Sequence, residues 1–227
     1  MHQMNVLIGP AALVRVFAVL LVMVCAAPAS SGALLYDISG RSSGSAFAGF
    51  GGNWGLRFTL SQSTTVASFG LWDEGSDGLA GAHSVGVFTT GGSLLGSAIV
   101  NNSSIVVPSA ASVGRWLFTD LGSTFNLSEG TYVLGLFDQA VGNDPFRGNA
   151  ATTFMAGASY NEARARSGAP SFAMPDGVSG VNQGWFGPNL STTALASSTV
   201  PEPSSGAMLL LAAIACHSWC RRPVRAL

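Results

Sequence analysis

Three carboxylates lie close together in one glycine-rich stretch of the chain. Asp73, Glu74 and Asp77 all fall within the segment Trp72–His83. Ca²⁺ prefers oxygen ligands on flexible backbone, so this stretch could hold a structural calcium ion. The alternative is a solvated turn, in which Asp side chains stabilise the loop backbone. Loops of β-proteins are commonly rich in Asp and Gly, which favours the alternative.

An EF-hand does not account for these carboxylates. A loop of that kind beginning at Asp73 would need an acidic or amide residue at 75 and Glu at 84. The chain has Gly75 and Ser84 at these positions. A calcium site would therefore need contributors from elsewhere in the chain. The more distant candidates are Asp138, Asn143 and Asp144.

The residue types that hydrolases use are sparse between the two apolar ends of the chain. His83 is the only histidine there, so any Ser-His-Asp relay would have to include it. The glutamates in this part of the chain, Glu74, Glu129 and Glu162, show no pairing of the kind that glycosidases need. We therefore expect no catalytic residues, and we expect His83 to be a structural hydrogen-bonding group.

Tryptophan side chains could stack on sugar rings. Trp54 and Trp185 are flanked by Gly and Asn, so we expect these two to be exposed. Trp72 and Trp116 lie within predicted strands, and large aromatic residues in strands usually pack inward. A calcium-assisted carbohydrate-binding module is therefore the alternative function, and an extracellular hydrolase is a weaker one.

The elements that would position these residues are strands. Twenty-nine glycines and many Ser, Thr, Ala and Val residues are typical of strands joined by tight turns. Strand-forming residues bounded by turn residues predict strands at Gly55–Leu60, Val66–Trp72, His83–Phe88, Leu94–Val100, Ile105–Val107, Arg115–Thr119 and Thr131–Phe137, with weaker signals at Thr152–Tyr160 and Leu190–Leu195. The only helical signal is at Asn161–Arg166. We expect one all-β domain over residues 34–198, a jelly-roll-like antiparallel β-sandwich.

Charge and cysteine content limit the partners of this domain. The formal net charge is −1, charged residues make up 9% of the chain, and all ten basic residues are arginine. No basic patch is available to neutralise a phosphate backbone, so we expect no nucleic-acid partner. Cys25, Cys216 and Cys220 all lie in the terminal segments. We therefore expect a domain without disulfides and without a cofactor, apart from the calcium considered above.

The amino-terminal segment has the layout of a signal peptide, which we assign to residues 1–33. Arg15 precedes an uninterrupted apolar run from Val16 to Ala27. Small residues follow, so cleavage is expected after Ala29 or after Ala33. An uncleaved helical anchor is the alternative, although the apolar run is short for one.

The carboxyl-terminal segment, residues 199–227, combines a proline break, an apolar run and a basic end. Pro201, Glu202 and Pro203 precede the run Gly206–Cys220, and three arginines follow, namely Arg221, Arg222 and Arg225. As a helix the run would rise roughly 22 Å, which is short against a hydrocarbon core of about 30 Å. The arginines favour a cytoplasmic position for the end of the chain. An ordinary tail anchor and a buried terminal helix are the alternatives.

This tail resembles the PEP-CTERM sorting signal of exported bacterial proteins. The resemblance rests on Pro201-Glu202-Pro203, the apolar run and Arg221-Arg222. It implies recognition and removal of the tail by an exosortase-type membrane protease, after signal peptidase has acted. It also implies transient anchoring in the membrane and delivery to the cell surface or extracellular matrix, where extracellular polysaccharide is a candidate partner.

The middle of the chain resembles an extracellular domain of unknown function that recurs in PEP-CTERM proteins. The resemblance runs from about Gly55 to Phe137, with Phe69-Gly70-Leu71-Trp72-Asp73 and Gly130-Thr131-Tyr132-Val133 among the residues that carry it. It implies a β-sandwich and no established reaction. The expected role is structural or adhesive.

Overall fold

Every regular element that the structure describes is a β-strand. This computed structural model describes residues 33–40, 46–47, 51–138, 144, 146–148, 150–179 and 185–195. The predicted sorting tail lies outside these ranges, and so does the predicted signal peptide except for Ala33. These ranges contain no helix that could span a membrane.

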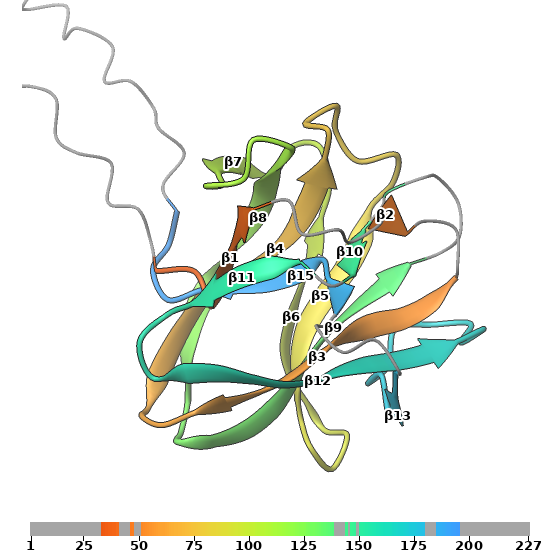
Figure 1. The fold of residues 1–227 in the computed structure, drawn as a ribbon. Coiled ribbons are helices and arrows are strands. Elements are labelled where there is room, and N and C mark those ends of the chain that lie inside the picture. The colour runs from red at the N-terminus through yellow and green to blue at the C-terminus, as the bar shows by residue number, and fades with distance from the viewer. Residues whose placement is uncertain are drawn as a thin grey trace, which may run out of the picture. The chain divides into compact units, whose positions relative to one another are not determined.

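Two larger sheets make up most of the fold, and both are antiparallel throughout (Figure 1). The first has six strands in the order β13 (Gly177–Val178), β12 (Ala158–Ser167), β3 (Gly52–Leu60), β9 (Gly130–Asp138), β5 (His83–Thr89) and β6 (Leu94–Val100). The second has four strands in the order β15 (Pro188–Ser191), β4 (Thr64–Glu74), β8 (Gly114–Leu127) and β7 (Ile105–Pro108).

Two small antiparallel sheets complete the described elements. One pairs β1 (Tyr36–Gly40) with β11 (Ala151–Phe154). The other has the order β14 (Trp185–Phe186), β10 (Phe146–Gly148) and β2 (Ala46–Phe47). The described part of the chain is therefore all-β, in an arrangement compatible with a β-sandwich.

Seven of the predicted strands are confirmed, since each lies within an observed strand. The prediction for Leu94–Val100 matches the bounds of β6, which pairs with β5 as a hairpin. The helical signal at Asn161–Arg166 is wrong, because these residues belong to β12. Glu, Ala and Arg favour a helix locally, but β12 pairs with β3 from Ala158 to Ser167, and such tertiary pairing overrides a weak local propensity.

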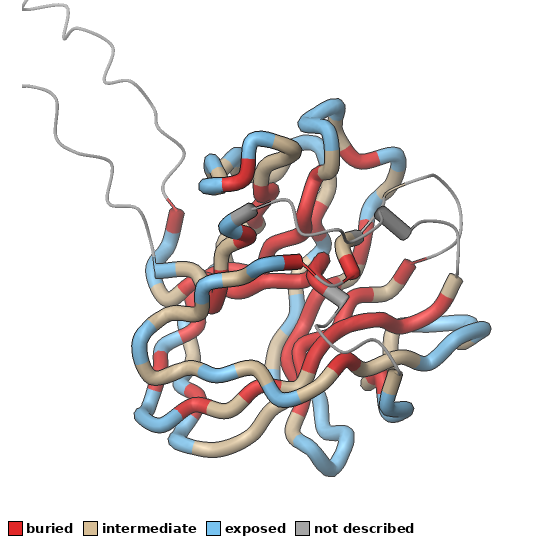
Figure 2. The backbone as a smooth tube through the Cα atoms, in the orientation of Figure 1, coloured by how far each residue is buried: buried red, intermediate tan, exposed pale blue. Residues whose placement is uncertain are grey.

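Buried residues lie along the strands, as the colouring of the backbone shows (Figure 2). Aromatic side chains form much of this core. Trp72 and Trp116 are cross-strand partners of β4 and β8, and their ring centroids lie 5.0 Å apart. They are 1% and 0% exposed, which confirms that both pack inward. Tyr36 meets the edge of Trp116 at 5.5 Å. Nearly every residue of β4 is buried, so both faces of this strand are covered.

Glycines on three adjacent strands of the six-stranded sheet form a row. It lies on the face opposite the Trp54 and Leu56 side chains. Gly55, Gly135 and Gly86 are register partners on β3, β9 and β5. A Cβ atom on Gly135 would lie 2.8 Å from Cδ of Pro175. The segment 171–176 therefore approaches the sheet at a distance that only glycine permits there.

Asn53 holds this segment against the sheet by hydrogen bonds. Its side-chain amide donates to the carbonyl of Ser171 at 2.9 Å, and its Oδ1 accepts from the amide of Ala173 at 2.9 Å. Asn53 is fully buried, and both ends of its amide group are satisfied by the segment that it holds. Ring contact between Phe88 and Phe172 adds apolar packing, with centroids 5.3 Å apart.

Candidate functional site: the acidic loop after β4

The three predicted carboxylates differ in their surroundings. Asp73 and Glu74 are the last two residues of β4, whereas Asp77 is exposed in the loop that follows. Asp73 is 1% exposed. A buried carboxylate is costly unless it is paired and hydrogen-bonded, so the partners of Asp73 and Glu74 decide what this site can do.

Asp73 forms an ion pair across β4 and β8. Its Oδ2 lies 2.6 Å from Nε of Arg115, its register partner. Its Oδ1 accepts a hydrogen bond from the amide of Gly78 at 3.1 Å. The same side chain thus neutralises an arginine and closes the start of the loop onto the strand.

Glu74 is engaged by two donors. Its Oε2 accepts from the indole Nε1 of Trp72 at 2.7 Å and from Nε of Arg147 at 2.7 Å. A second contact joins Oε1 of Glu74 to Arg147, so the guanidinium is held at two points. The hydrogen bond to Glu74 is the main cause that raises the pKa of Arg147, against the lowering effect of its burial. This geometry is a bidentate charge-assisted pair.

His83 and Asp144 hold the other end of the loop. Nε2 of His83 lies 2.6 Å from Oδ2 of Asp144, and both side chains are buried. The two carboxylate oxygens of Asp144 also accept from the amides of Ala80 and Gly81, at 2.6 and 3.1 Å. Nδ1 of His83 faces the carbonyl oxygen of Phe137 at 3.4 Å. Both ring nitrogens therefore have hydrogen-bond partners within the chain, as expected of a structural hydrogen-bonding group.

Asn102 holds the middle of the loop. Its Oδ1 accepts from the amide of Leu79, and its Nδ2 donates to the carbonyl of the same residue, each at 2.6 Å. Gly78 has a φ of +98°, and a Cβ atom there would lie 2.8 Å from Oδ1 of Asn102. Glycine is thus required at 78 by both conformation and space.

The acidic loop, residues 73–83, is therefore held by hydrogen bonds and ion pairs with polar side chains from other parts of the chain. No sequence pattern indicated Asn102, Arg115 or Arg147, because each lies on a separate strand or loop far along the chain from its partner. Within the described residues, no group of three or more His, Asp or Glu side chains is placed to hold a metal ion. Asp138 is buried at the end of β9, and Asn143 lies outside the described residues. Calcium binding by Asp73, Glu74 and Asp77 stays a prediction.

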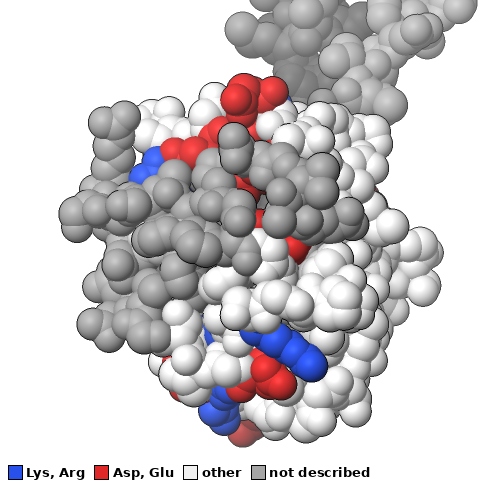
Figure 3. Space-filling model, turned by 90° about the vertical axis from the view of Figure 1, so that its right-hand side faces the viewer, with Lys and Arg blue, Asp and Glu red and all other residues white. Residues whose placement is uncertain are grey.

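Further ion pairs lie outside this loop. Figure 3 shows blue and red atoms side by side among described residues that are otherwise mostly uncharged. Oε1 of Glu162 lies 3.2 Å from Arg57 and 2.5 Å from Arg164. Arg166 lies 3.8 Å from Asp176, and this last pair is half-exposed. These contacts link β3, β12 and the segment before β13.

The two tryptophans predicted for stacking are not both at the surface. The expectation that Trp54 is exposed is wrong, because this residue is 7% exposed and belongs to the hydrophobic core. Its flanking Gly and Asn residues lie in β3, where Gly55 meets the backbone of Leu134 and Asn53 holds the segment 171–176. Trp185 lies in β14, and its side chain is outside what the structure describes.

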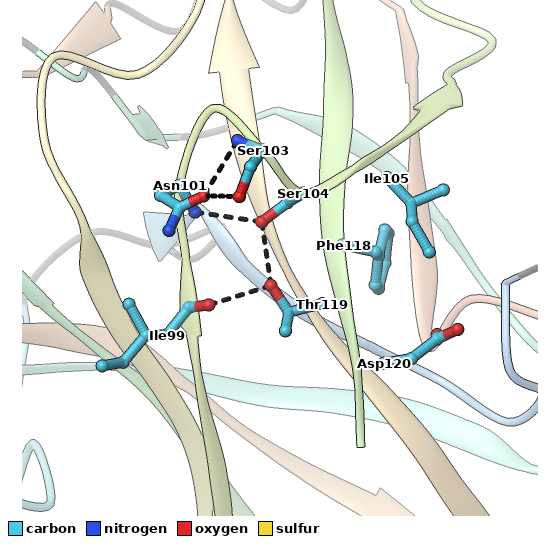
Figure 4. A pocket seen from close by; sticks show the side chains of 8 residues that line it. All are labelled: Ile99, Asn101, Ser103, Ser104, Ile105, Phe118, Thr119 and Asp120. Atoms are coloured by element: carbon cyan, nitrogen blue, oxygen red, sulfur yellow. Dashed lines mark hydrogen bonds between the residues drawn. The ribbon is translucent and has the colours of Figure 1, made fainter. Parts of the chain in front are cut away.

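A small hollow with polar and apolar lining residues lies between the end of β6 and the middle of β8 (Figure 4). Its volume is ≈ 190 Å³, below the roughly 300–1,000 Å³ of common ligand pockets. The hydroxyls of Ser104 and Thr119 lie 2.8 Å apart, and Thr119 donates to the carbonyl of Ile99 at 2.9 Å. Asn101 accepts from Ser103. These polar groups hydrogen-bond mainly to one another, and the bond from Thr119 to Ile99 links β8 to β6.

No family model, no curated protein and no solved structure gives a significant match to this chain. The function is therefore inferred from the sequence and from the geometry described above.

Proposed function

We propose that this chain is an exported, non-catalytic protein of the cell surface or extracellular matrix, with a structural or adhesive role. The domain is a jelly-roll-like β-sandwich. Signal peptidase removes the amino-terminal segment, and an exosortase-type protease recognises Pro201, Glu202 and Pro203 and removes the tail. The apolar run and the arginines after it, Arg221 and Arg222 among them, hold the protein transiently in the membrane until that cleavage.

The geometry of the acidic loop supports the proposal that the domain is not catalytic. A general base or nucleophile needs a lone pair directed at a substrate, and a general acid needs a proton directed at one. Asp73 and Glu74 instead direct their oxygens at Arg115 and Arg147. His83 directs both ring nitrogens at groups of the same chain. The side chains that could act as bases or nucleophiles therefore hold the loop in place instead.

The composition of the domain suits an extracellular setting. It has no cysteine, so its stability depends on packing and hydrogen bonds and not on the redox state of its surroundings. Its few charged side chains are largely paired within the fold. Such a domain presents a surface of low charge density, which fits a structural or adhesive component better than a protein that binds nucleic acid.

Surface detection of the full chain in its native host tests the proposal. An epitope inserted in the exposed turn between β5 and β6, at Thr90–Gly92, leaves both ends of the chain intact. We expect intact cells to bind the antibody. The matched variant carries Pro201→Ala, Glu202→Ala and Pro203→Ala, and its uncut tail should keep the protein in the membrane fraction. Wild-type protein found only in the cytosol would overturn the proposal.

A further inference from the structure

The first described residues of the chain form an additional edge beside β15. Leu34 and Ser191 form an antiparallel bridge. Two backbone hydrogen bonds flank it, from the amide of Thr192 to the carbonyl of Ala33 at 3.0 Å and from the amide of Leu35 to the carbonyl of Leu190 at 2.8 Å. The carbonyl group of Ala33 therefore takes part in the hydrogen bonding of the folded domain.

The residues after Ala33 are part of the core. Leu35 is fully buried, and Leu34 is partly buried and packs against the core cluster. Any new amino terminus created at this point would thus lie on the hydrophobic edge of the domain.

The sequence offers two cleavage sites, and they leave different domains. A cut after Ala33 removes the carbonyl that accepts from Thr192. It also places the new α-ammonium group on Leu34, and such a group is largely charged at neutral pH. A charged group beside an apolar cluster and an amide without its partner are both unfavourable. A cut after Ala29 leaves Ser30 to Ala33 attached and preserves both bonds of the bridge.

We propose that signal peptidase cleaves after Ala29, so that the mature chain begins at Ser30. Ala27 and Ala29 supply the small residues that the enzyme requires. The short segment from Ser30 to Gly32 then separates the charged amino terminus from the bridge. This inference rests on the proposed export of the protein, because an unexported chain is not cleaved at all.

Amino-terminal peptide sequencing of the full chain, recovered after export, tests the inference. The expected amino terminus is Ser30. A chain that begins at Leu34 would overturn the inference while leaving export intact. An exported chain that retains residues 1–29 would also overturn it. Finding the chain only in the cytosol, with residues 1–29 still attached, would instead contradict the proposed export, so the two failures are distinguishable.

Two matched variants sharpen the test, since each replaces the small residue immediately before one candidate cut. Ala29→Leu should cause loss of the Ser30 product, whereas Ala33→Leu should leave the Ser30 terminus unchanged. The side chain of Ala33 is exposed, so the fold tolerates leucine there. The reverse pattern, with Ala33→Leu abolishing the mature product and Ala29→Leu having no effect, would place the cut after Ala33.

Discussion

Asp73 and Arg115 face each other across β4 and β8, with Oδ2 of the aspartate 2.6 Å from Nε of the arginine. The carboxylate is 1% exposed, whereas the arginine side chain is 32% exposed. The pair therefore lies at the boundary between core and solvent. It neutralises the one acidic-loop carboxylate that is fully buried, and it ties the loop to the centre of the four-stranded sheet.

Asp73→Asn should destabilise the domain by about 1–2 kcal/mol. Removing one partner of a fully buried pair costs about 3–5 kcal/mol, but the partial exposure of Arg115 reduces that cost. The asparagine can still accept from the amide of Gly78. Urea unfolding should show a lower midpoint with an unchanged slope. Asp77→Asn is the control, because Asp77 is exposed, and an equal loss in this variant would contradict the assigned roles.

Calcium should change the unfolding temperature of the full chain little. Asp73 and Glu74 already have arginine partners, so an ion would have to displace Arg115 and Arg147 to use them. Thermal unfolding in millimolar Ca²⁺ and in EDTA should give coincident curves. A rise in the midpoint with calcium that Asp77→Asn abolishes would establish the calcium site instead, because a ligand that binds only the folded state stabilises it.

Gly135→Ala should destabilise the domain by about 1–3 kcal/mol, the usual cost of overpacking. The added methyl group would lie 2.8 Å from Cδ of Pro175 and would push the segment 171–176 from the sheet. Gly122→Ala is the matched control on β8, where a Cβ atom would meet nothing within 4 Å. Denaturant midpoints of the two variants measure the difference. Equal midpoints would show that the segment does not lie against the glycine row.

Glu162 should contribute stability that disappears in acid. Burial raises the pKa of this carboxyl, but hydrogen bonds and charges from Arg57 and Arg164 outweigh burial and lower the pKa below its ordinary value of 4.5. A carboxyl with a lowered folded-state pKa stabilises the fold above its ordinary pKa, and loses that contribution as the pH falls through the folded value.

The difference in unfolding free energy between wild type and Glu162→Gln should therefore be greatest near neutral pH and should shrink below pH 4.5. Urea titrations between neutral and acidic pH measure it. Glu129→Gln, in the exposed turn between β8 and β9, is the control. A difference that grows as the pH falls would contradict the assigned sign.

The strands were predictable because their patterns are local. Residues 94–100 follow the turn signal Thr89-Thr90-Gly91-Gly92, so the β5–β6 hairpin could be predicted from the sequence alone. The partners of the acidic loop were not predictable in this way. Arg115 lies 42 residues from Asp73 and Arg147 lies 73 residues from Glu74, and only the strand order brings them together. The expected exposure of Trp54 is wrong because its small neighbours have other roles in β3. Gly55 allows close packing against Leu134, and Asn53 binds the segment 171–176.

The most direct test of the account is the intact mass of the protein extracted from the surface of its native host. The account predicts one mature species that lacks the amino-terminal segment through Ala29 and the segment that follows Pro201-Glu202-Pro203. A single species of full-length mass, recovered from the cytosol, would contradict it.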